Sequence, residues 1–563
     1  MRTTPSSIDA TSDRYVDDYA RLNPIEATLL GIADYDEALT DFSPEGHQAR
    51  ADLTATALRD IEAAEASTDA ERAAKAVFTE RGRVNLALHD AGLLQADVNV
   101  IESPPQQIRM VFDLMDTDTA ADWELIAKRL ITVPDALANL RAGLAASAGK
   151  GQVAALRQIT KTADQCQTWA GQRGAASFFA DFVAGADDVE GVDNALRTEL
   201  LAGASAAASA YGDLAHFLRT ELAPKAPEKD AVGPDVYRLW SRYFTGAELD
   251  LAEAYQWGWE EFFRVEAEMK QVANRIKTGA TLAEAAAALD ADPQYRIHGK
   301  DGLQAWMQRL SDQALDELRG VHFDIPDPLM KLECRIAPPG GGVGAYYTGP
   351  ADDFSRPGRM WWSVPADRTE YSTWRETSTV YHEGVPGHHL QIATAVNQAA
   401  TLNRFQRLMS TTSGHCEGWA LYAERLMREL GYLRDEGDLM GMLDAHLFRA
   451  ARVIVDIGMH LELEIPAGTG FHPGERWTPE LGLEFLLTRT ITDAHHVHDE
   501  IDRYLGWPGQ APSYKLGERL WLTARDEAKQ RKGADFDLRQ FHKQALELGS
   551  MGLDTLRERL AEL

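Results

Sequence analysis

Residues 381–389 read YHEGVPGHH and come close to a metal-binding signature. In the usual form, His-Glu-x-x-His on one helix, two imidazoles four residues apart ligate zinc and the glutamate between them acts as a general base. His382 and Glu383 fit this pattern, but Pro386 stands where the second histidine belongs. The stretch is therefore either an accidental match or a metal site with extra residues between its ligands.

Two later histidines compete for the place of the second ligand. Because a helix turns about 100° per residue, His388 lies on a different face from His382, and His389 lies on the same face about two turns away. Pro386 has no N–H to continue the helix, and the flanking glycines tolerate unusual backbone angles. A widened turn over residues 384–387 would bring His388 to the ligand position. We therefore favour His388 as the ligand and keep His389 as the fallback.

A carboxylate on a following helix is the expected third ligand. Residues 411–413 can cap a helix that runs to about Leu430, with Gly431 as its stop. Glu417 lies in the first turns of this helix, where zinc sites of the two-His-one-Glu type take their third ligand. Glu424 follows seven residues later on the same face. The alternative for either residue is a solvated helix carboxylate, and the apolar neighbours of Glu417 favour Glu417 over Glu424.

The sequence around these residues resembles a bacterial family of unknown function. The segment HEGVPGHHLQ (residues 382–391), followed by EGWALYAE (residues 417–424), is similar to domain-of-unknown-function family 885. That family in turn resembles gluzincin zinc metallopeptidases of the carboxypeptidase Taq type. The resemblance covers nearly the whole chain and includes residues 23–28, 346–358, 452–460 and 500–517.

The resemblance implies a mainly α, two-lobed metallopeptidase-like fold with a deep cleft and a small β-sheet next to the metal-binding helix. It also implies that Glu383 is the general base. We expect one Zn²⁺ held by His382, His388 and Glu417, with Glu424 beside the ligands. The two histidine ligands of the peptidases are four residues apart, whereas this chain has two extra residues between them.

Three polar residues at four-residue spacing mark an otherwise apolar helix. Arg452, Asp456 and His460 share one helix face. One interpretation is a buried structural ion pair. The functional interpretation places this stripe beside the metal. There Asp456 accepts a hydrogen bond from a zinc-bound imidazole, and His460 donates to the substrate carbonyl or oxyanion.

Residues 503–515 form a loop that enters a helix and carries further candidates. Peptide hydrolysis needs a donor for the developing oxyanion. Tyr514 is the candidate and Tyr504 the reserve, because a phenol donates without adding charge. Arg503 or Lys515 can bind a peptide carboxylate. Loop tyrosines and basic residues are also often structural or solvated.

The rest of the chain is mostly helical in pattern. Residues 43–222 are rich in Ala, Leu, Glu and Arg, and helical patterning resumes after the prolines at 224–234 and again from Ser372. We expect residues 1–320 to form a helical N-terminal region that supplies much of the cleft walls. Residues 321–563 are expected to form the catalytic region, and the two together one continuous bilobed unit.

Short strands are expected between the helical parts, at residues 321–325, 331–337 and 359–364. The glycine-rich loop 338–344 is not a phosphate loop, because no Gly-Lys-Ser/Thr follows. We interpret it as a flexible loop beside the sheet and a candidate for substrate contact. Tyr347, in the same region, is a further candidate for substrate binding.

Composition excludes some classes of partner. A net charge of −30, from 87 acidic and 57 basic residues, opposes binding to nucleic acid or to anionic membranes. The three cysteines form no Cys-x-x-Cys pair, which fits a reducing compartment. The start of the chain lacks an apolar segment, and no run reaches the length of a membrane span. We therefore expect a cytoplasmic protein.

Together these patterns predict a zinc-dependent hydrolase that cleaves peptide bonds of short peptides, as a carboxypeptidase or an oligopeptidase. The preference for short peptides rests on the family resemblance and the cleft that it implies. The alternatives are a zinc hydrolase of a non-peptide amide and a non-catalytic peptide-binding protein that keeps the fold. Acyl-enzyme chemistry is not expected, because the chain lacks a Gly-x-Ser-x-Gly elbow and its cysteines lack a nucleophile signature. Residues 495–498 are not expected to bind a second metal, because neighbouring helix residues do not converge.

Overall fold

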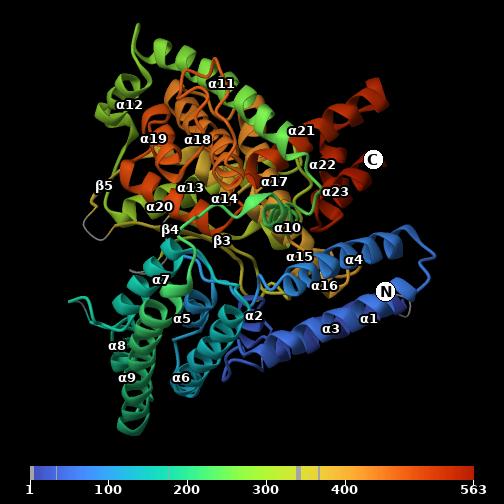
Figure 1. Ribbon diagram of the computed structural model, residues 1–563. Helices are drawn as coiled ribbons and strands as arrows, with labels where there is room; N and C mark the ends of the chain where they lie inside the picture. The colour runs from blue at the N-terminus through green and yellow to red at the C-terminus, as the bar shows by residue number, and fades with distance from the viewer. Residues whose placement is uncertain (1–5, 33, 175, 338–343, 366–367) are drawn as a thin grey trace.

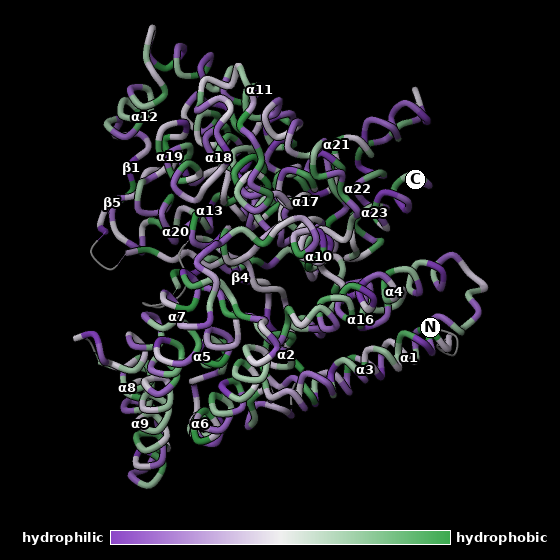
Figure 2. Tube along the Cα trace, viewed as in Figure 1, coloured by the Kyte–Doolittle hydropathy of each residue, from purple (hydrophilic) through white to green (hydrophobic). Residues whose placement is uncertain are grey.

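The computed structural model of the chain describes residues 6–32, 34–174, 176–337, 344–365 and 368–563. Helices hold 68% of the described residues and strands 5%, which confirms the mainly α class. The first nine α-helices are α1 (Ser7–Leu22), α2 (Pro24–Leu29), α3 (Pro44–Ala63), α4 (Asp69–Asp90), α5 (Pro104–Leu114), α6 (Ala120–Gly149), α7 (Leu156–Trp169), α8 (Phe178–Ala184) and α9 (Asn194–Phe217). Hydrophilic and hydrophobic residues alternate along most of them, as amphipathic packing requires (Figure 2).

The remaining α-helices are α10 to α23. They are α10 (Gly233–Thr245), α11 (Leu251–Ile276), α12 (Leu282–Ala291), α13 (Lys300–Leu318), α14 (Thr373–Glu383), α15 (His388–Asn397), α16 (Arg404–Leu408), α17 (Ser413–Glu429), α18 (Glu436–Leu461), α19 (Pro479–Arg489), α20 (Ala494–Gly506), α21 (Ser513–Lys532), α22 (Leu538–Glu547) and α23 (Leu553–Ala561). Among the described residues, no helix is both long enough and apolar enough to cross a membrane.

Two hydrophobic cores divide the molecule. The smaller core takes its side chains from α2 and from α5 to α9, which lie together in the lower part of Figure 1. The larger core combines α1, α3 and α4 with α10 and the elements that follow it. These two cores do not coincide with the division at residue 320 that the sequence suggested. One reason is that α11, which precedes residue 320, packs closely along α18, which follows it. A Cβ on Gly258 of α11 would lie 2.9 Å from the Val453 side chain of α18.

Two small sheets interrupt the helices. In one, β2 (Leu332–Ile336) pairs in parallel with β4 (Gly358–Ser363), which pairs antiparallel with β3 (Gly344–Thr348). In the other, β1 (Arg296–His298) pairs antiparallel with β5 (Glu370–Ser372). The expected strands at 331–337 and 359–364 are therefore present. The loop expected to contact substrate lies, at 338–343, outside the described residues.

The expected strand at residues 321–325 is wrong. The chain leaves α13 through Gly320, whose φ of +74° suits a glycine, and the Gly320 N–H donates to the Phe323 carbonyl at 2.8 Å. Pro326 follows two residues after Asp324. This tight turn leaves no length for a ladder, so only an isolated bridge between Arg319 and Phe323 forms.

The helix predicted between residues 413 and 430 is confirmed as α17. The Thr412 hydroxyl accepts from the His415 N–H at 3.3 Å, which caps the first turn. Gly431, with φ +85°, ends the helix. Glycines also let α17 cross α21 closely, because a Cβ on Gly418 would lie 2.5 Å from Gly517. The start of α21 is thereby held against α17.

Candidate metal centre

Helix α14 ends at Glu383 and α15 begins at His388, so the two candidate histidine ligands lie on different helices. His382 is near the end of α14 and His388 is the first residue of α15. The sequence analysis expected one helix with a widened turn, and the structure has two helices joined by a non-helical turn at residues 384–387. This turn is held by the Gly387 N–H, which donates to the Tyr381 carbonyl at 3.0 Å, and by the Trp419 indole, which donates to the Pro386 carbonyl at 2.8 Å.

Glycine is required in this turn because there is no room for a side chain. A Cβ on Gly387 would lie 1.9 Å from the carbonyl oxygen of His382, and one on Gly384 would lie 2.7 Å from the carbonyl oxygen of Val380. Without side chains, the turn can approach the last residues of α14 closely. As a result the rings of His382 and His388 lie 4.7 Å apart, centre to centre.

Three donor atoms converge at this turn. The Oε2 atom of Glu417 lies 3.1 Å from Nε2 of His382 and 3.6 Å from Nε2 of His388. Tetrahedral zinc with bonds of 2.0–2.2 Å places its ligand atoms about 3.3–3.5 Å apart. The two histidines are buried and the Glu417 side chain is 19% exposed. This donor set therefore fits the chemistry and the spacing of a zinc site.

Glu383 lies in the same cluster but is free of hydrogen bonds at one oxygen. A carboxylate oxygen of Glu383 and one nitrogen from each of His382 and His388 all lie within 4.8 Å of one another. Its Oε2 atom is buried and has no partner. Burial raises the pKa of this carboxyl, and the two neighbouring imidazoles counter the rise only in part. A buried carboxylate with a free oxygen beside the donors is suited to proton transfer.

Glu424 orients His382 from the opposite side. The Nδ1 atom of His382 donates to Oε1 of Glu424 at 2.8 Å, and the Ser378 hydroxyl donates to the other oxygen. Glu424 is fully buried; burial alone would raise its pKa, but Arg449 at 3.4 Å and His382 hold the pKa of the carboxyl well below its usual range. A carboxylate on Nδ1 keeps the proton there and leaves Nε2 as the metal-binding atom.

Cys416 plays a similar part for His388, and the sequence analysis missed it. Its Sγ atom lies 3.2 Å from Nδ1 of His388. Both histidines therefore have Nδ1 occupied and direct Nε2 towards Glu417. The one signal in the sequence was the position of Cys416 next to Glu417.

His389 is turned away from the cluster. Its Nε2 donates to the Leu329 carbonyl at 2.8 Å, and its Nδ1 lies 2.9 Å from the Tyr347 hydroxyl. Burial lowers the pKa of His389 to about 4. With both nitrogens bonded, His389 ties α15 to the sheet, and the geometry favours His388 over His389 as the ligand. Tyr347, expected to contact substrate, is the hydroxyl partner of this histidine.

Asp456 and His460 do not reach the cluster. Asp456 accepts from the Tyr237 hydroxyl at 2.6 Å and from the Gly509 N–H at 2.9 Å. His460 is fully buried and its Nε2 donates to the Tyr504 carbonyl at 2.9 Å. The helix rise explains the separation. The residues of α18 that contact Glu424 are His446 and Arg449, and Asp456 lies about 10 Å beyond Arg449 along the axis. Glu424, rather than Asp456, is the partner of the imidazole.

The candidates of residues 503–515 divide into two groups. Lys515 is fully buried and donates to Glu261 at 2.8 Å and to Glu518 at 2.6 Å, so its charge is neutralised inside the core rather than offered to a substrate. The Tyr504 hydroxyl is likewise buried, and it donates to Glu500 at 2.7 Å. Two candidates remain partly exposed, Arg503 and Tyr514.

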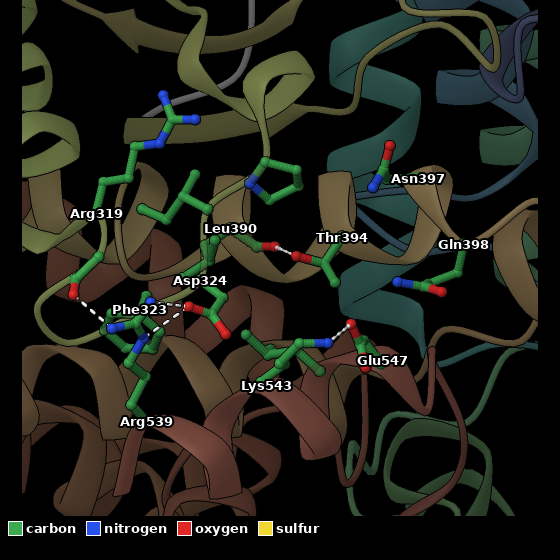
Figure 3. Close-up of a pocket in the computed structure, with 14 residues that line it drawn as sticks. Arg319, Phe323, Asp324, Leu390, Thr394, Asn397, Gln398, Arg539, Lys543 and Glu547 are labelled. Carbon is green, nitrogen blue, oxygen red and sulfur yellow. Dashed lines mark hydrogen bonds and ion pairs between the residues drawn. The ribbon is translucent and has the colours of Figure 1, made fainter.

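No second group of three ligand-type side chains occurs among the described residues, and those at 495–498 do not converge. A pocket of about 430 Å³ lies elsewhere, between α15 and α22, and no candidate ligand lines it (Figure 3). Its cations are paired: Arg539 with Asp324, and Lys543 with Glu547. This pocket is separate from the candidate metal centre.

The fold and sequence place the chain in a known family without an established function. Residues 24–560 match the family described as "Bacterial protein of unknown function (DUF885)", and the chain belongs to this family, as the sequence predicted. No curated protein matches the chain.

Two solved structures share the fold. One, from Colwellia psychrerythraea and described as a "putative lipoprotein", superposes with a TM-score of 0.83 at 22% identity and covers 99% of this chain and 98% of its own. The other, from Shewanella oneidensis and described as a "putative lipoprotein of unknown function", gives a TM-score of 0.72 at 18% identity, with 98% and 99% covered. At these identities the likeness shows a shared fold.

Proposed function

We propose that this protein is a zinc-dependent hydrolase that cleaves peptide bonds of short peptides. The observation that carries the proposal is the convergence of His382, His388 and Glu417 at ligand spacing, with a partner-free oxygen of Glu383 beside them. Two imidazoles and one carboxylate are the donor set of many hydrolytic zinc sites, which keep a fourth position for water or substrate. Glu417 is the most exposed of the four side chains, so the cluster opens on its side.

Zinc held by these residues would act as a Lewis acid that polarises the substrate carbonyl and lowers the pKa of water. The chain supplies the proton transfers. Glu383 takes a proton from the attacking water and then delivers it to the leaving amine, a role that suits a carboxyl whose pKa is raised by burial. Glu424 holds the proton on Nδ1 of His382 throughout, so that this imidazole keeps its orientation.

The choice of peptides as substrates is supported by resemblance rather than by the metal centre itself. The YHEGVPGHH and EGWALYAE segments resemble gluzincin peptidases, and a mainly α architecture with two cores is compatible with their two-lobed fold and cleft. Tyr514, which is half-buried near Arg449, remains the candidate donor to the oxyanion. A zinc hydrolase of a non-peptide amide and a non-catalytic peptide-binding protein are the competing functions.

Two measurements separate these functions. Elemental analysis of the purified protein is expected to give one zinc per chain, and a library of short peptides is expected to be hydrolysed only when zinc is present. Zinc with hydrolysis of other amides alone would favour the first alternative. Peptide binding without hydrolysis at full zinc content would favour the second, and a chain that binds no zinc would refute the proposal.

The cellular location is a separate prediction. The sequence predicts a cytoplasmic protein, whereas both structural relatives are described as lipoproteins. Fractionation of cells that express the tagged natural gene product distinguishes the two. Recovery with the soluble cytoplasmic fraction would support the prediction, and recovery with membranes would replace it by the location that the relatives suggest.

A further inference from the structure

Three arginines gather around Tyr514 next to the candidate metal centre. Arg449 and Arg452 lie about one turn apart on α18, with guanidinium carbons 5.8 and 4.7 Å from the centre of the Tyr514 ring. Arg503 comes from α20 and shares the acid partner of Arg452. The three side chains are 13%, 8% and 16% exposed. They form a mostly buried basic cluster in a chain whose net charge is −30.

The acids around this cluster do not balance its charge. Glu500 alone serves two arginines, at 2.8 Å from Arg452 and 2.9 Å from Arg503. Among the described residues, the only acid within ion-pair distance of Arg449 is Glu424, at 3.4 Å, and that carboxylate also accepts from His382. Three guanidinium groups therefore face two carboxylates, one of which is shared with an imidazole. An uncompensated buried charge is costly unless a further anion joins it.

Several donors of the cluster also lack acceptors. Nη1 of Arg452 and Nε of Arg503 are buried without a hydrogen-bond partner, and Arg449 makes no hydrogen bond among the described residues. Buried donors are normally satisfied, so such atoms point to an absent acceptor. Lys515 provides the contrast, because it donates to two carboxylates and is fully paired a short distance along α21.

The cluster lies within reach of a bound peptide. Arg449 contacts Glu424, and Glu424 contacts His382, so one carboxylate separates the cluster from the metal donors. Guanidinium groups bind carboxylates through paired hydrogen bonds, and one carboxylate supplies the single negative charge that the cluster lacks.

We propose that Arg449, Arg452 and Arg503 bind the free C-terminal carboxylate of a peptide, so that the enzyme is a carboxypeptidase. This inference rests on the proposed function. In the reaction, water adds across the last peptide bond: the C–N bond breaks, the hydroxyl of water goes to the carbonyl carbon and its one remaining proton goes to the leaving nitrogen. The products are a free amino acid and a peptide shortened by one residue.

The carboxylate site can be tested without turnover. Calorimetry of the metal-free full chain with an N-acetylated dipeptide is expected to show binding, and the C-terminal amide of the same dipeptide is expected to bind at least about tenfold more weakly, the scale of a lost charge-assisted hydrogen bond. In Arg449→Gln and Arg503→Gln the two ligands should bind alike. Arg489→Gln, which removes a half-buried arginine that pairs with Glu266 elsewhere, should keep the preference.

Turnover of free and amidated peptides separates this inference from the proposed function. Zinc-dependent cleavage of both forms at equal rates would overturn the inference and leave the hydrolase intact. Carboxylate-selective binding without any hydrolysis would keep the site and refute the hydrolase. Equal binding of acid and amide by the wild type would overturn the inference whatever the activity. Because Arg452 is the most buried of the three, the test uses the two more exposed arginines, and circular dichroism confirms that each variant is folded.

Discussion

Two clusters in the larger core each combine a buried histidine with a carboxylate. They differ in how many side chains that can bind a metal come together. In the candidate metal centre, His382 and His388 direct Nε2 towards one oxygen of Glu417. On α18, Asp456 and His460 are both fully buried, and each also keeps one atom without a partner. Among the described residues, however, no third ligand-type side chain joins them. Convergence of several donors, rather than burial of a histidine with an acid, therefore marks the site.

The largest expected effect on the site comes from removing its base. Glu383→Gln should keep zinc bound and lower kcat about 10²–10⁴-fold, because the amide cannot take the proton of water. Glu376→Gln is the matched control, since it changes a carboxylate two turns earlier on α14. Measuring kcat and the zinc content of both variants checks this. Unchanged turnover in Glu383→Gln would exclude the base.

Three histidines, His388, His389 and His460, differ in the effect that their replacement is expected to have on zinc binding. His388→Gln should weaken zinc binding by more than about 100-fold, beyond the usual effect of losing a hydrogen-bond partner of a ligand. His389→Gln and His460→Gln should leave the affinity nearly unchanged, because both nitrogens of His389 and Nε2 of His460 are bonded to groups outside the cluster. Competition with a chromogenic chelator measures all three. A large loss in His389→Gln instead would reverse the assignment.

Loss of the orienting carboxylate should have an intermediate effect. Glu424→Gln is expected to weaken zinc binding about 10–100-fold, because the proton on Nδ1 of His382 loses its anionic partner. Hydrolysis should return at saturating zinc. The same chelator competition, followed by rate measurements at high zinc, tests this. If Asp456→Asn weakened zinc as much, the contrast between the two clusters would fail.

The turn that separates the ligands should tolerate no side chain. Gly387→Ala is expected to destabilise the protein by about 1–3 kcal/mol, because its Cβ would overlap the His382 carbonyl. It should also weaken zinc binding. Gly149→Ala, at the exposed end of α6 with nothing within 4 Å of the added atom, should change stability by less than about 1 kcal/mol. Urea unfolding of both variants measures the difference, and equal midpoints would show that the turn adapts.

Replacement of Asp456 is expected to have the smallest effect on the candidate metal centre. It should instead change how the stability of the protein depends on pH. Burial raises the pKa of Asp456 to about 7, although the Tyr237 hydroxyl and the Gly509 N–H lower it in part. Since the folded pKa lies above the unfolded value of 3.8, its contribution to stability is complete below pH 3.8 and is lost as pH rises to about 7.

Asp456→Asn should remove this loss, which is on the order of a few kcal/mol. Both hydrogen bonds end on one oxygen of Asp456, so the amide can still accept them. Urea midpoints of wild type and variant should therefore converge at pH 4 and diverge towards pH 7, with the variant more stable. Parallel profiles would show that Asp456 is ionised throughout.

Local patterns in the sequence predicted the parts of the site that depend on local structure. The cap at Thr412 and the stop at Gly431 indicated α17, and thereby the helix face that Glu417 and Glu424 share. The glycines around Pro386 indicated a special turn, but only the structure shows that this turn ends one helix and separates it from the next.

The rest depended on long-range packing. Lys515 is neutralised by Glu261, more than two hundred residues away, and no local pattern reports that pair. The spacing of Asp456 and His460 gave their common face but not their distance from His382. The division at residue 320 was drawn from a change in local pattern, and such a pattern does not report that α11 packs against α18 across it.

The most direct test of the metal centre is anomalous diffraction at the zinc edge from crystals of the zinc-loaded protein. The account predicts one peak at about 2.0–2.2 Å from Nε2 of His382, Nε2 of His388 and an oxygen of Glu417. A peak at another site, or none at full zinc concentration, would contradict it.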